Sequence, residues 1–302
     1  MIIAHSKKKI LITGCNGFLG SNLIHHFSGL QYEVIGTSLN SDTHHNHIDY
    51  IPGDLLDKEF IKKVIKKYKP DVVINTVALV DLDLCEVKED LAFKTNVSTA
   101  INLAEALNNC HSHLIHISTD QLFSGSKSFY SEIDVPAPIN VYGKTKLKAE
   151  NECIQRHTQT TVVRTNIIGW SPANHKETFA EWVFFNLKNN KLINMFTDFY
   201  FTPIDVSLFA DAIDRVIINP LIGVFNIAGT ERCSKYDFGV ELSKLFGFDE
   251  LNIIPSEMKL HNFKAKRQSD LSLSINKFFN ATNYRLPNIS ESLKALKKNL
   301  TI

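Results

Sequence analysis

The sequence predicts an α/β fold, in which a doubly wound parallel sheet is followed by a smaller C-terminal lobe. Three observations support this prediction. Short β-branched apolar runs alternate with amphipathic helical segments, a glycine-rich turn joins the first run to the first helix, and the alternation breaks after Asn166. Strands that alternate with helices imply right-handed crossovers, which gather the strands into one parallel sheet with helices on both faces.

The expected strands are short and apolar, as strands buried on both faces of a parallel sheet are. They lie at residues 9–13, 32–37, 47–52, 71–77, 114–118, 161–165 and 223–227. Helices are expected where apolar residues recur at helical spacing, at 19–27, 58–68, 90–108, 140–156 and 205–218. We therefore expect residues 1–166 and 205–228 to form the sheet domain, and 167–204 and 229–302 to form the smaller lobe.

Composition excludes several classes of protein. The 33 basic and 32 acidic residues leave a net charge of +1, which argues against nucleic acid as a partner. No apolar run reaches the ~18 residues of a membrane span, and the first residues lack the order of a signal peptide. Five scattered cysteines without a Cys-x-x-Cys pair indicate free thiols and no metal site. We expect a cytoplasmic protein that does not bind membranes.

The first expected strand ends in a glycine-rich turn, Gly14-Cys15-Asn16-Gly17-Phe18-Leu19-Gly20. Gly14 permits a tight turn, Gly17 lets the backbone approach a pyrophosphate, and Gly20 lets the helix pack closely on the strand. The free N–H groups at the start of the helix, around Asn16, Phe18 and Leu19, would then bind the pyrophosphate. The turn therefore predicts a dinucleotide-binding site.

The end of the second expected strand bears on the choice of cofactor. An acidic residue there would bind the ribose 2′-hydroxyl and repel a 2′-phosphate, but the strand ends in Thr37 and Ser38. NADPH is therefore weakly favoured over NADH. His44, His45 and His47 could flank the phosphate, although a solvated loop is the interpretation that we favour.

Asp54 follows the third expected strand, where the adenine of a dinucleotide would bind. Its carboxylate could accept a hydrogen bond from the adenine amino group. The alternative is a structural role, as the N-cap or an Asx-turn of the next helix.

Tyr142 and Lys146 lie four residues apart in the expected helix 140–156 and so share one face. An ammonium near a phenol lowers the pKa of the phenol, and such a tyrosine can act as a general acid toward a carbonyl. The spacing is common by chance, but Ser118, Thr119 and Asp120 close the fifth strand at the carboxyl edge of the sheet, where ligands bind in such folds.

The order of the glycine turn, the Ser-Thr pair and the Tyr-x-x-x-Lys spacing resembles that of extended short-chain dehydrogenases/reductases. Within that family the chain resembles the dTDP-4-dehydrorhamnose reductase branch. The matching stretches are PDVVINTVALVDLDLCE (70–86), HISTDQLFSG (116–125), PINVYGKTKLKAE (138–150), VRT (163–165) and KAKRQSDLSLSINK (264–277). The resemblance implies a Rossmann fold with a substrate-binding lobe, a possible homodimer, and NAD(P)H-dependent reduction of the C4 keto group of a nucleotide-activated deoxy sugar.

The resemblance also implies roles for single residues. Thr119 would polarise the sugar carbonyl, Tyr142 would donate the proton, and Lys146 would tune Tyr142 and hold the nicotinamide ribose. Further implied cofactor contacts are Asp54, Leu55, Val77, Ala78, Leu79, Asn96 and Ile167. Implied substrate contacts are Thr119, Asp120, Gln121, Asn166 and Arg267. Arg267 would face the diphosphate, and the alternative for it is a surface ion pair.

Several residues depart from the usual pattern of the branch, namely Leu79-Val80, Gln121-Leu122, Ile167, Gln268 and Asp270. We expect these positions to face the sugar nucleotide, and we hypothesise a 4-keto-sugar nucleotide reductase with a different sugar or base. A non-catalytic NADP-binding regulatory subunit and a sugar-nucleotide epimerase stay open on the same scaffold. The aromatic cluster at Phe179–Phe201 could hold a nucleobase, but we favour a core role for it over this or an interface.

Overall fold

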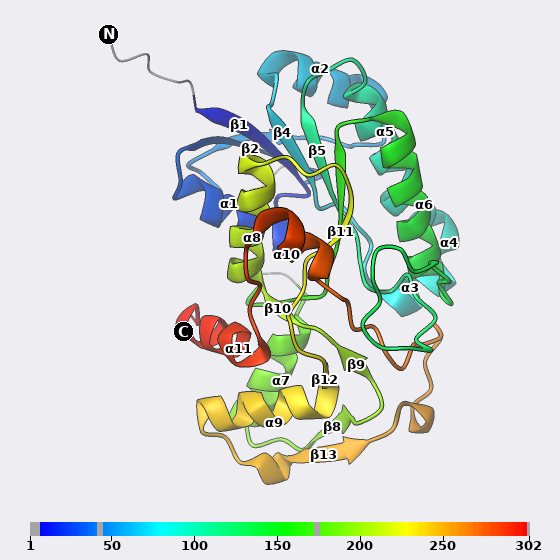
Figure 1. Cartoon of the computed structure of the whole chain (residues 1–302), viewed down its shortest axis with the longest axis vertical. Coiled ribbons are helices and arrows are strands. Elements are labelled where there is room, and N and C mark those ends of the chain that lie inside the picture. Colours follow the sequence, from blue (N-terminus) through cyan, green and yellow to red (C-terminus); the bar gives the residue numbers. More distant parts are fainter. Residues whose placement is uncertain (1–6, 41–44, 172–175, 301–302) are drawn as a thin grey trace.

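The computed structural model describes residues 7–40, 45–171 and 176–300, and it confirms the α/β class. Seven strands form the central parallel sheet in the order β11-β6-β5-β4-β1-β2-β3 (Figure 1). Their bounds are β1 Lys8–Thr13, β2 Tyr32–Ser38, β3 Asp49–Pro52, β4 Val72–Asn75, β5 His113–Ile117, β6 Thr160–Arg164 and β11 Gly223–Asn226. The chain runs outward from β1 in both directions, which is the doubly wound topology that the sequence predicted.

Helices cover both faces of the sheet because the side chains of each strand alternate between the faces. Ile10 and Ile12 of β1 join one apolar cluster, and Leu11 joins the other. The first cluster includes residues of α1 (Phe18–Ser28), α8 (Val206–Ile218) and α10 (Asn276–Thr282), and the second includes residues of α2 (Lys58–Tyr68), α5 (Thr99–Ala106) and α6 (Val141–Arg156). Within the described residues, no helix is both long and apolar enough to cross a membrane.

The smaller lobe packs around the buried rings of Phe184, Phe201 and Phe238 and occupies the lower part of Figure 1. Its elements are α7 Phe179–Lys188, β8 Ile193–Phe196, β9 Tyr200–Phe201, β12 Cys233–Ser234, α9 Lys235–Phe246, β13 Ile253–Ser256 and α11 Ile289–Lys298. At the junction with the sheet domain, β7 (Ile167–Ile168) pairs with β10 (Ile204–Asp205). Phe278 of α10 lies in the apolar cluster of the sheet domain, and the exact division into two domains stays a prediction.

The expected helix at 90–108 is interrupted. After α3 (Leu82–Val87) and α4 (Glu89–Phe93), the residues Lys94–Ser98 form a π-helical turn that leads into α5. A π turn holds one residue more than an α turn and often marks a functional site. Here Asn96 within the turn is buried, with 1% of its surface exposed.

A buried ion pair holds α6 against the sheet. Arg164, the last residue of β6, places its Nη2 atom 2.8 Å from Oε2 of Glu150, and its Nε atom donates to the same carboxylate. Both side chains are buried. Glu150 lies one turn beyond Lys146 and two turns beyond Tyr142 on the same face of α6. The ion pair therefore fixes the helix that carries the Tyr-x-x-x-Lys spacing.

We expect Arg164→Leu to lower the free energy of unfolding by about 3–5 kcal/mol, because it leaves the Glu150 carboxylate buried and unpaired. Urea denaturation measures this. The exposed pair of Lys244 and Glu241 supplies the control, since Lys244→Met should leave the free energy of unfolding nearly unchanged. Equal costs for the two variants would show that the buried pair does not hold α6.

Candidate active site

The glycine turn connects β1 to α1 at close range because Gly14 and Gly20 leave no room for a side chain. Gly14 has a φ of +71°, in the left-handed region that favours glycine. A Cβ atom there would lie 3.0 Å from Oγ1 of Thr76, and a Cβ atom on Gly20 would overlap the carbonyl group of Gly14. The start of α1 is therefore held directly against the end of β1.

The N-terminus of α1 can accept an anion. Gly17 is its N-cap residue and no side chain caps the helix, whereas Asp57 caps α2 and Asn140 caps α6. The backbone N–H groups of Phe18 and Leu19 lie in this uncapped first turn. Uncapped N–H groups and the positive end of the helix dipole together fit a pyrophosphate, so the turn has the donors that a dinucleotide needs.

Thr37 and Ser38, the two predicted cofactor contacts at the end of β2, differ in how their hydroxyl groups are used. Thr37 donates from Oγ1 to the carbonyl oxygen of Ile51, 2.7 Å away, and so links β2 to β3. Ser38 is half-buried at the open end of the strand. His45 places Nε2 3.3 Å from the carbonyl oxygen of Cys15, and His44 lies outside the described residues.

Asp54 forms the Asx-turn that the sequence offered as an alternative. Its Oδ1 atom accepts a hydrogen bond from the N–H of Leu56 at 2.8 Å, while the N-cap of α2 is Asp57. The carboxylate is exposed, so its other oxygen can still face a ligand. Leu55 is buried in the apolar cluster under α2, and its side chain belongs to the core.

Asn96 holds the segment that follows β4. Its Oδ1 atom accepts from the N–H of Leu79 at 2.7 Å, and its Nδ2 atom donates to the carbonyl oxygen of Leu79 and to Oγ1 of Thr145 on α6. The amide is therefore fully engaged, and Asn96 acts as a positioning residue. Val77 and Ala78, two more predicted cofactor contacts, are half-buried in the same segment.

The three predicted catalytic residues lie where β5 ends and α6 begins. Thr119 follows β5, and its hydroxyl lies close enough to the phenol of Tyr142 to act on the pKa of that phenol. The ammonium of Lys146 donates to the carbonyl oxygen of Ile117 at 2.6 Å. All three side chains are buried, so their polar groups are arranged in a site from which most water is excluded.

Burial governs the protonation of these groups. It raises the pKa of the Tyr142 phenol above its usual 10, an effect that the hydrogen bond to Thr119 opposes. It also lowers the pKa of Lys146 to about 8. The sequence predicted that Lys146 would depress the pKa of Tyr142. The structure does not show this depression, because the ammonium is turned to Ile117 and desolvation of the phenol dominates.

Asp120 supports Thr119 from inside the protein. Its Oδ1 atom accepts from Thr119 Oγ1 at 3.2 Å, and its Oδ2 atom accepts from Nδ2 of Asn166. Burial raises the pKa of the carboxyl to about 6, although the hydrogen bond from Asn166 and the charge of Lys235 act in the opposite direction. Asp120 and Asn166 were both predicted to bind substrate, and here their side chains are hydrogen-bonded to each other.

We expect Asp120→Asn to stabilise the protein more at pH 7.5 than at pH 4.5. Between pH 3.8 and about 6 the folded state holds a proton that the unfolded state has lost, so the contribution of Asp120 to stability falls as pH rises through this window. The difference between the two pH values should be about 2 kcal/mol. Urea titrations at both pH values measure it, with Asp90→Asn as a control for loss of an exposed charge; no pH difference would contradict the burial cost.

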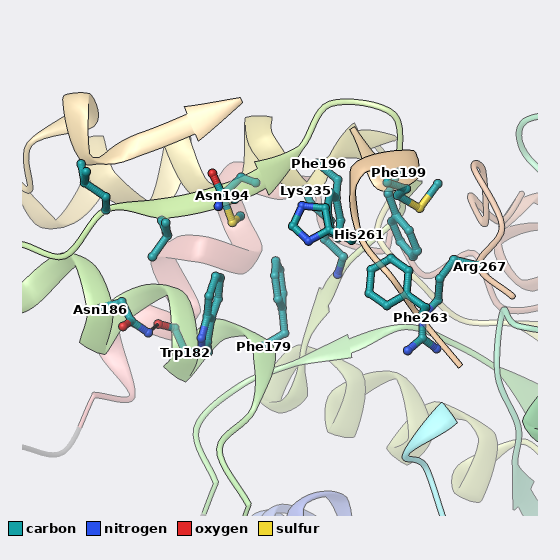
Figure 2. A pocket seen from close by; sticks show the side chains of 14 residues that line it. Phe179, Trp182, Asn186, Asn194, Phe196, Phe199, Lys235, His261, Phe263 and Arg267 are labelled. Atoms are coloured by element: carbon teal, nitrogen blue, oxygen red, sulfur yellow. Dashed lines mark hydrogen bonds between the residues drawn. The ribbon is translucent and has the colours of Figure 1, made fainter. Parts of the chain in front are cut away.

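The smaller lobe contains a cavity of about 490 Å³ (Figure 2). It is lined mainly by aromatic and other apolar side chains, and also by Lys235, His261 and Arg267. The aromatic residues of the cluster at Phe179–Phe201 therefore have two roles, in the core of the lobe and in the lining of the cavity. Phe184 and Phe201 belong to the lobe core, whereas Phe179, Trp182, Phe196 and Phe199 line the cavity.

Arg267 forms the ion pair that was the alternative interpretation for it, and its contact with a diphosphate stays a prediction. Its Nη2 atom forms an ion pair with Oδ1 of Asp83 on α3, at 2.9 Å, and its side chain also lines the cavity (Figure 2). The preceding residue, Lys266, accepts a hydrogen bond at its carbonyl oxygen from Nδ2 of Asn140, the cap of α6. The cavity and the catalytic helix are thus linked through one segment of chain.

Two of the departing residues do not face a ligand. Leu122 is fully buried in a cluster with Phe123 and Tyr130. Asp270 accepts from Nε of Arg232 at 2.6 Å and from the hydroxyl of Ser272. Packing and an ion pair therefore account for both residues, and the expectation that they contact the sugar nucleotide was wrong.

Gln121 and Gln268 do meet beside the catalytic residues. The Nε2 atom of Gln268 donates to the carbonyl oxygen of Gln121 at 3.2 Å. Within the described chain, the side-chain oxygens of both glutamines are buried without a hydrogen-bond partner. Such acceptors are costly to bury unpaired, so these two residues can take donors from a ligand.

The fold and the site define an extended short-chain dehydrogenase/reductase, with a Rossmann sheet, a glycine turn and a buried Tyr-x-x-x-Lys pair beside Thr119. The chain matches the model described as the RmlD substrate binding domain over residues 8–302, and it belongs to this family of sugar-nucleotide reductases.

Three curated proteins show the range of this family. The chain is 27% identical over 289 residues to the probable low-salt glycan biosynthesis reductase Agl14 of Haloferax volcanii, which covers 95% of this chain and 96% of that protein. It is 28% identical over 250 residues to dTDP-4-dehydrorhamnose reductase of Aggregatibacter actinomycetemcomitans, covering 80% and 79%. It is 26% identical over 254 residues to the beta subunit of methionine adenosyltransferase 2 of Rattus norvegicus, covering 82% and 75%.

Solved structures agree with this assignment. The dTDP-4-dehydrorhamnose reductase ortholog of Clostridium acetobutylicum superposes with a TM-score of 0.84 at 30% identity, covering 96% of this chain and 98% of that one. The dTDP-4-dehydrorhamnose reductase of Bacillus anthracis, solved in complex with NADP, gives a TM-score of 0.87 at 23% identity and covers 97% and 100%. At 23% identity, the similarity to the Bacillus anthracis protein is evidence for a shared fold only.

Proposed function

We infer that this protein reduces the C4 keto group of a nucleotide-activated deoxy sugar with NADPH. The observation that carries this inference is the convergence of Thr119, Tyr142 and Lys146 in a buried site at the carboxyl edge of the sheet. The uncapped N-terminus of α1 supplies a place for the cofactor pyrophosphate on the same edge. The names of two relatives, a glycan biosynthesis reductase and a dTDP-4-dehydrorhamnose reductase, support the same reaction.

The side chains divide the chemistry between them. The cofactor, when bound, supplies a hydride. Thr119 donates a hydrogen bond to the carbonyl oxygen, and Tyr142 gives its proton to that oxygen, so that the ketone becomes an alcohol. Because burial raises the pKa of Tyr142, the phenol keeps its proton at neutral pH, as a general acid must. Lys146, whose ammonium donates to the carbonyl oxygen of Ile117, would hold the nicotinamide ribose.

The cavity in the smaller lobe would hold the nucleotide part of the substrate. Its aromatic rings, among them Phe179, Trp182 and Phe199, offer flat faces for a base. Arg267 is suited to a diphosphate because its guanidinium can donate two parallel hydrogen bonds. Gln121 and Gln268 lie beside Thr119 with unpaired oxygens, and they would accept hydrogen bonds from the sugar hydroxyls.

We expect the purified protein to oxidise NADPH with one member of a panel of dTDP-, UDP-, GDP- and CDP-4-keto sugars. Tyr142→Phe should lower that turnover by about 10²–10⁴-fold, because it removes the proton donor, and should leave NADPH binding unchanged. Loss of absorbance at the nicotinamide band measures turnover, and Tyr68→Phe on α2 is the matched control. Near-normal turnover by Tyr142→Phe would contradict the assigned role.

The panel also tests the hypothesis of an altered substrate. Gln121 and Gln268 differ from the residues usual in the dTDP-4-dehydrorhamnose reductase branch and lie at the site. Turnover of dTDP-4-dehydrorhamnose at a normal enzyme rate would contradict the hypothesis. Turnover confined to another sugar or base would support it.

We expect NADPH to bind at least as tightly as NADH, because β2 ends in Ser38 without a carboxylate. Ser38→Asp should shift the ratio of the two Kd values at least 10-fold toward NADH, since the new charge repels the 2′-phosphate. Fluorescence titration of both cofactors measures the ratio. Ser290→Asp on α11 adds the same charge elsewhere and should leave it unchanged; an equal shift in both variants would remove Ser38 from the site.

The methionine adenosyltransferase beta subunits among the relatives favour a second candidate, a non-catalytic subunit of a larger enzyme. This candidate predicts NADPH binding without turnover on any panel substrate. An epimerase would instead convert a sugar nucleotide without net consumption of NADPH. Product analysis of the same reactions separates the three functions.

A further inference from the structure

Lys235 holds a positive charge in the cavity in an unusual setting. It is the first residue of α9, and its ammonium lies 3.6 Å from the ring centroids of both Phe179 and Phe201 and 5.3 Å from that of Phe199. Figure 2 shows the side chain among the aromatic residues of the pocket. Aromatic faces attract and orient a cation, so the three rings fix where the ammonium lies.

The rings do not satisfy the hydrogen-bonding capacity of this ammonium. An ammonium has three N–H donors, and no oxygen of the described chain accepts a hydrogen bond or forms an ion pair with that of Lys235. Asp120 is close enough for the two charges to act on each other, but Asn166 and Thr119 already donate to its oxygens. Lys235 is half-buried, so its three donors are open to water or to a bound anion.

The other charged or titratable side chains of the cavity have partners. Arg267 is paired with Asp83, and Nε2 of His261 lies 3.0 Å from the hydroxyl of Ser256. Among the described lining residues, Lys235 is therefore the titratable side chain whose donors no protein oxygen accepts. Burial among the rings lowers its pKa to about 7, while Asp120 acts to raise it; an anion bound beside it would favour the charged form in the same way.

We propose that Lys235 is a specificity-determining residue that binds an anionic oxygen of the substrate inside this cavity. The proposal rests on the proposed function, because the ligand it names is the nucleotide sugar of that reaction. Two parts of such a substrate carry anionic oxygens, the diphosphate and a carboxylate on the sugar. Lys235 lies between the apolar cavity and Asp120 beside Thr119, a position that either group can reach.

Calorimetric titration of the NADP⁺-saturated protein tests the proposal. The probes are dTDP, UDP, GDP and CDP, together with UDP-glucose and UDP-glucuronate. Lys235→Met removes the charge and keeps most of the stem, and Lys235→Arg keeps the charge. Lys188→Met is the matched control, because Lys188 also lies over a ring, that of Phe184 at 5.8 Å, but does not line the cavity.

We expect Lys235→Met to raise the Kd of the tightest nucleoside diphosphate at least 10-fold, if Lys235 binds the diphosphate. If it binds a sugar carboxylate, only the Kd of UDP-glucuronate should rise. In either case Lys235→Arg should restore most of the binding, while Lys188→Met, the Kd of NADP⁺ and the Tm stay unchanged. A role in packing alone would lower the Tm and would not be rescued by arginine.

Two results would overturn the proposal. In one, Lys235→Met binds every probe as tightly as the wild type, and in the other, the wild type binds none of them. If the proposed function is wrong but the proposal holds, nucleotides would still bind in a Lys235-dependent way. No 4-keto sugar would then cause oxidation of NADPH. Turnover that persists with unaltered binding in Lys235→Met would instead refute the role of Lys235 alone.

Discussion

The site depends on a polar stripe buried along one face of α6. Tyr142, Lys146 and Glu150 follow one another at successive turns, and each is withdrawn from water. Such burial is costly unless each group finds a partner. The carbonyl oxygen of Ile117 on β5 is the partner of Lys146, and Arg164 on β6 is the partner of Glu150. The same contacts that make burial tolerable also fix the catalytic helix on the carboxyl edge of the sheet.

A second set of contacts joins this helix to the cavity of the smaller lobe. The segment around Arg267 crosses between the two regions, and Asp83 accepts from both Arg267 and the N–H of Ala265. Asn140, which caps α6, donates to the carbonyl oxygen of Lys266. A ligand that moves this segment therefore acts directly on the N-terminus of the catalytic helix. The position of Arg267 at the cavity and the position of Asn140 at the start of α6 are therefore set by neighbouring hydrogen bonds.

Sequence alone predicted the parts of the molecule that follow a period or a fixed spacing. The strands were placed to within about two residues because both-face burial demands continuous apolar runs, and the four-residue spacing of Tyr142 and Lys146 placed both side chains on one buried face of α6. Lys235 was missed because a lysine at a helix start is ordinary in sequence, and its aromatic neighbours come from distant segments. Leu122 and Asp270 were misplaced because their partners Leu273 and Arg232 are distant in the sequence and become neighbours only in the fold.

The π-helical turn at Lys94–Ser98 makes this part of the chain intolerant of changes in length. One residue of an α-helix corresponds to a rotation of about 100°. Deletion of a single residue there would return the turn to α geometry and swing one side of the helix away from α6. Asn96 could then no longer reach both Leu79 and Thr145. A substitution in this turn removes the contacts of one side chain, whereas an insertion or deletion changes which side chains face Leu79 and Thr145.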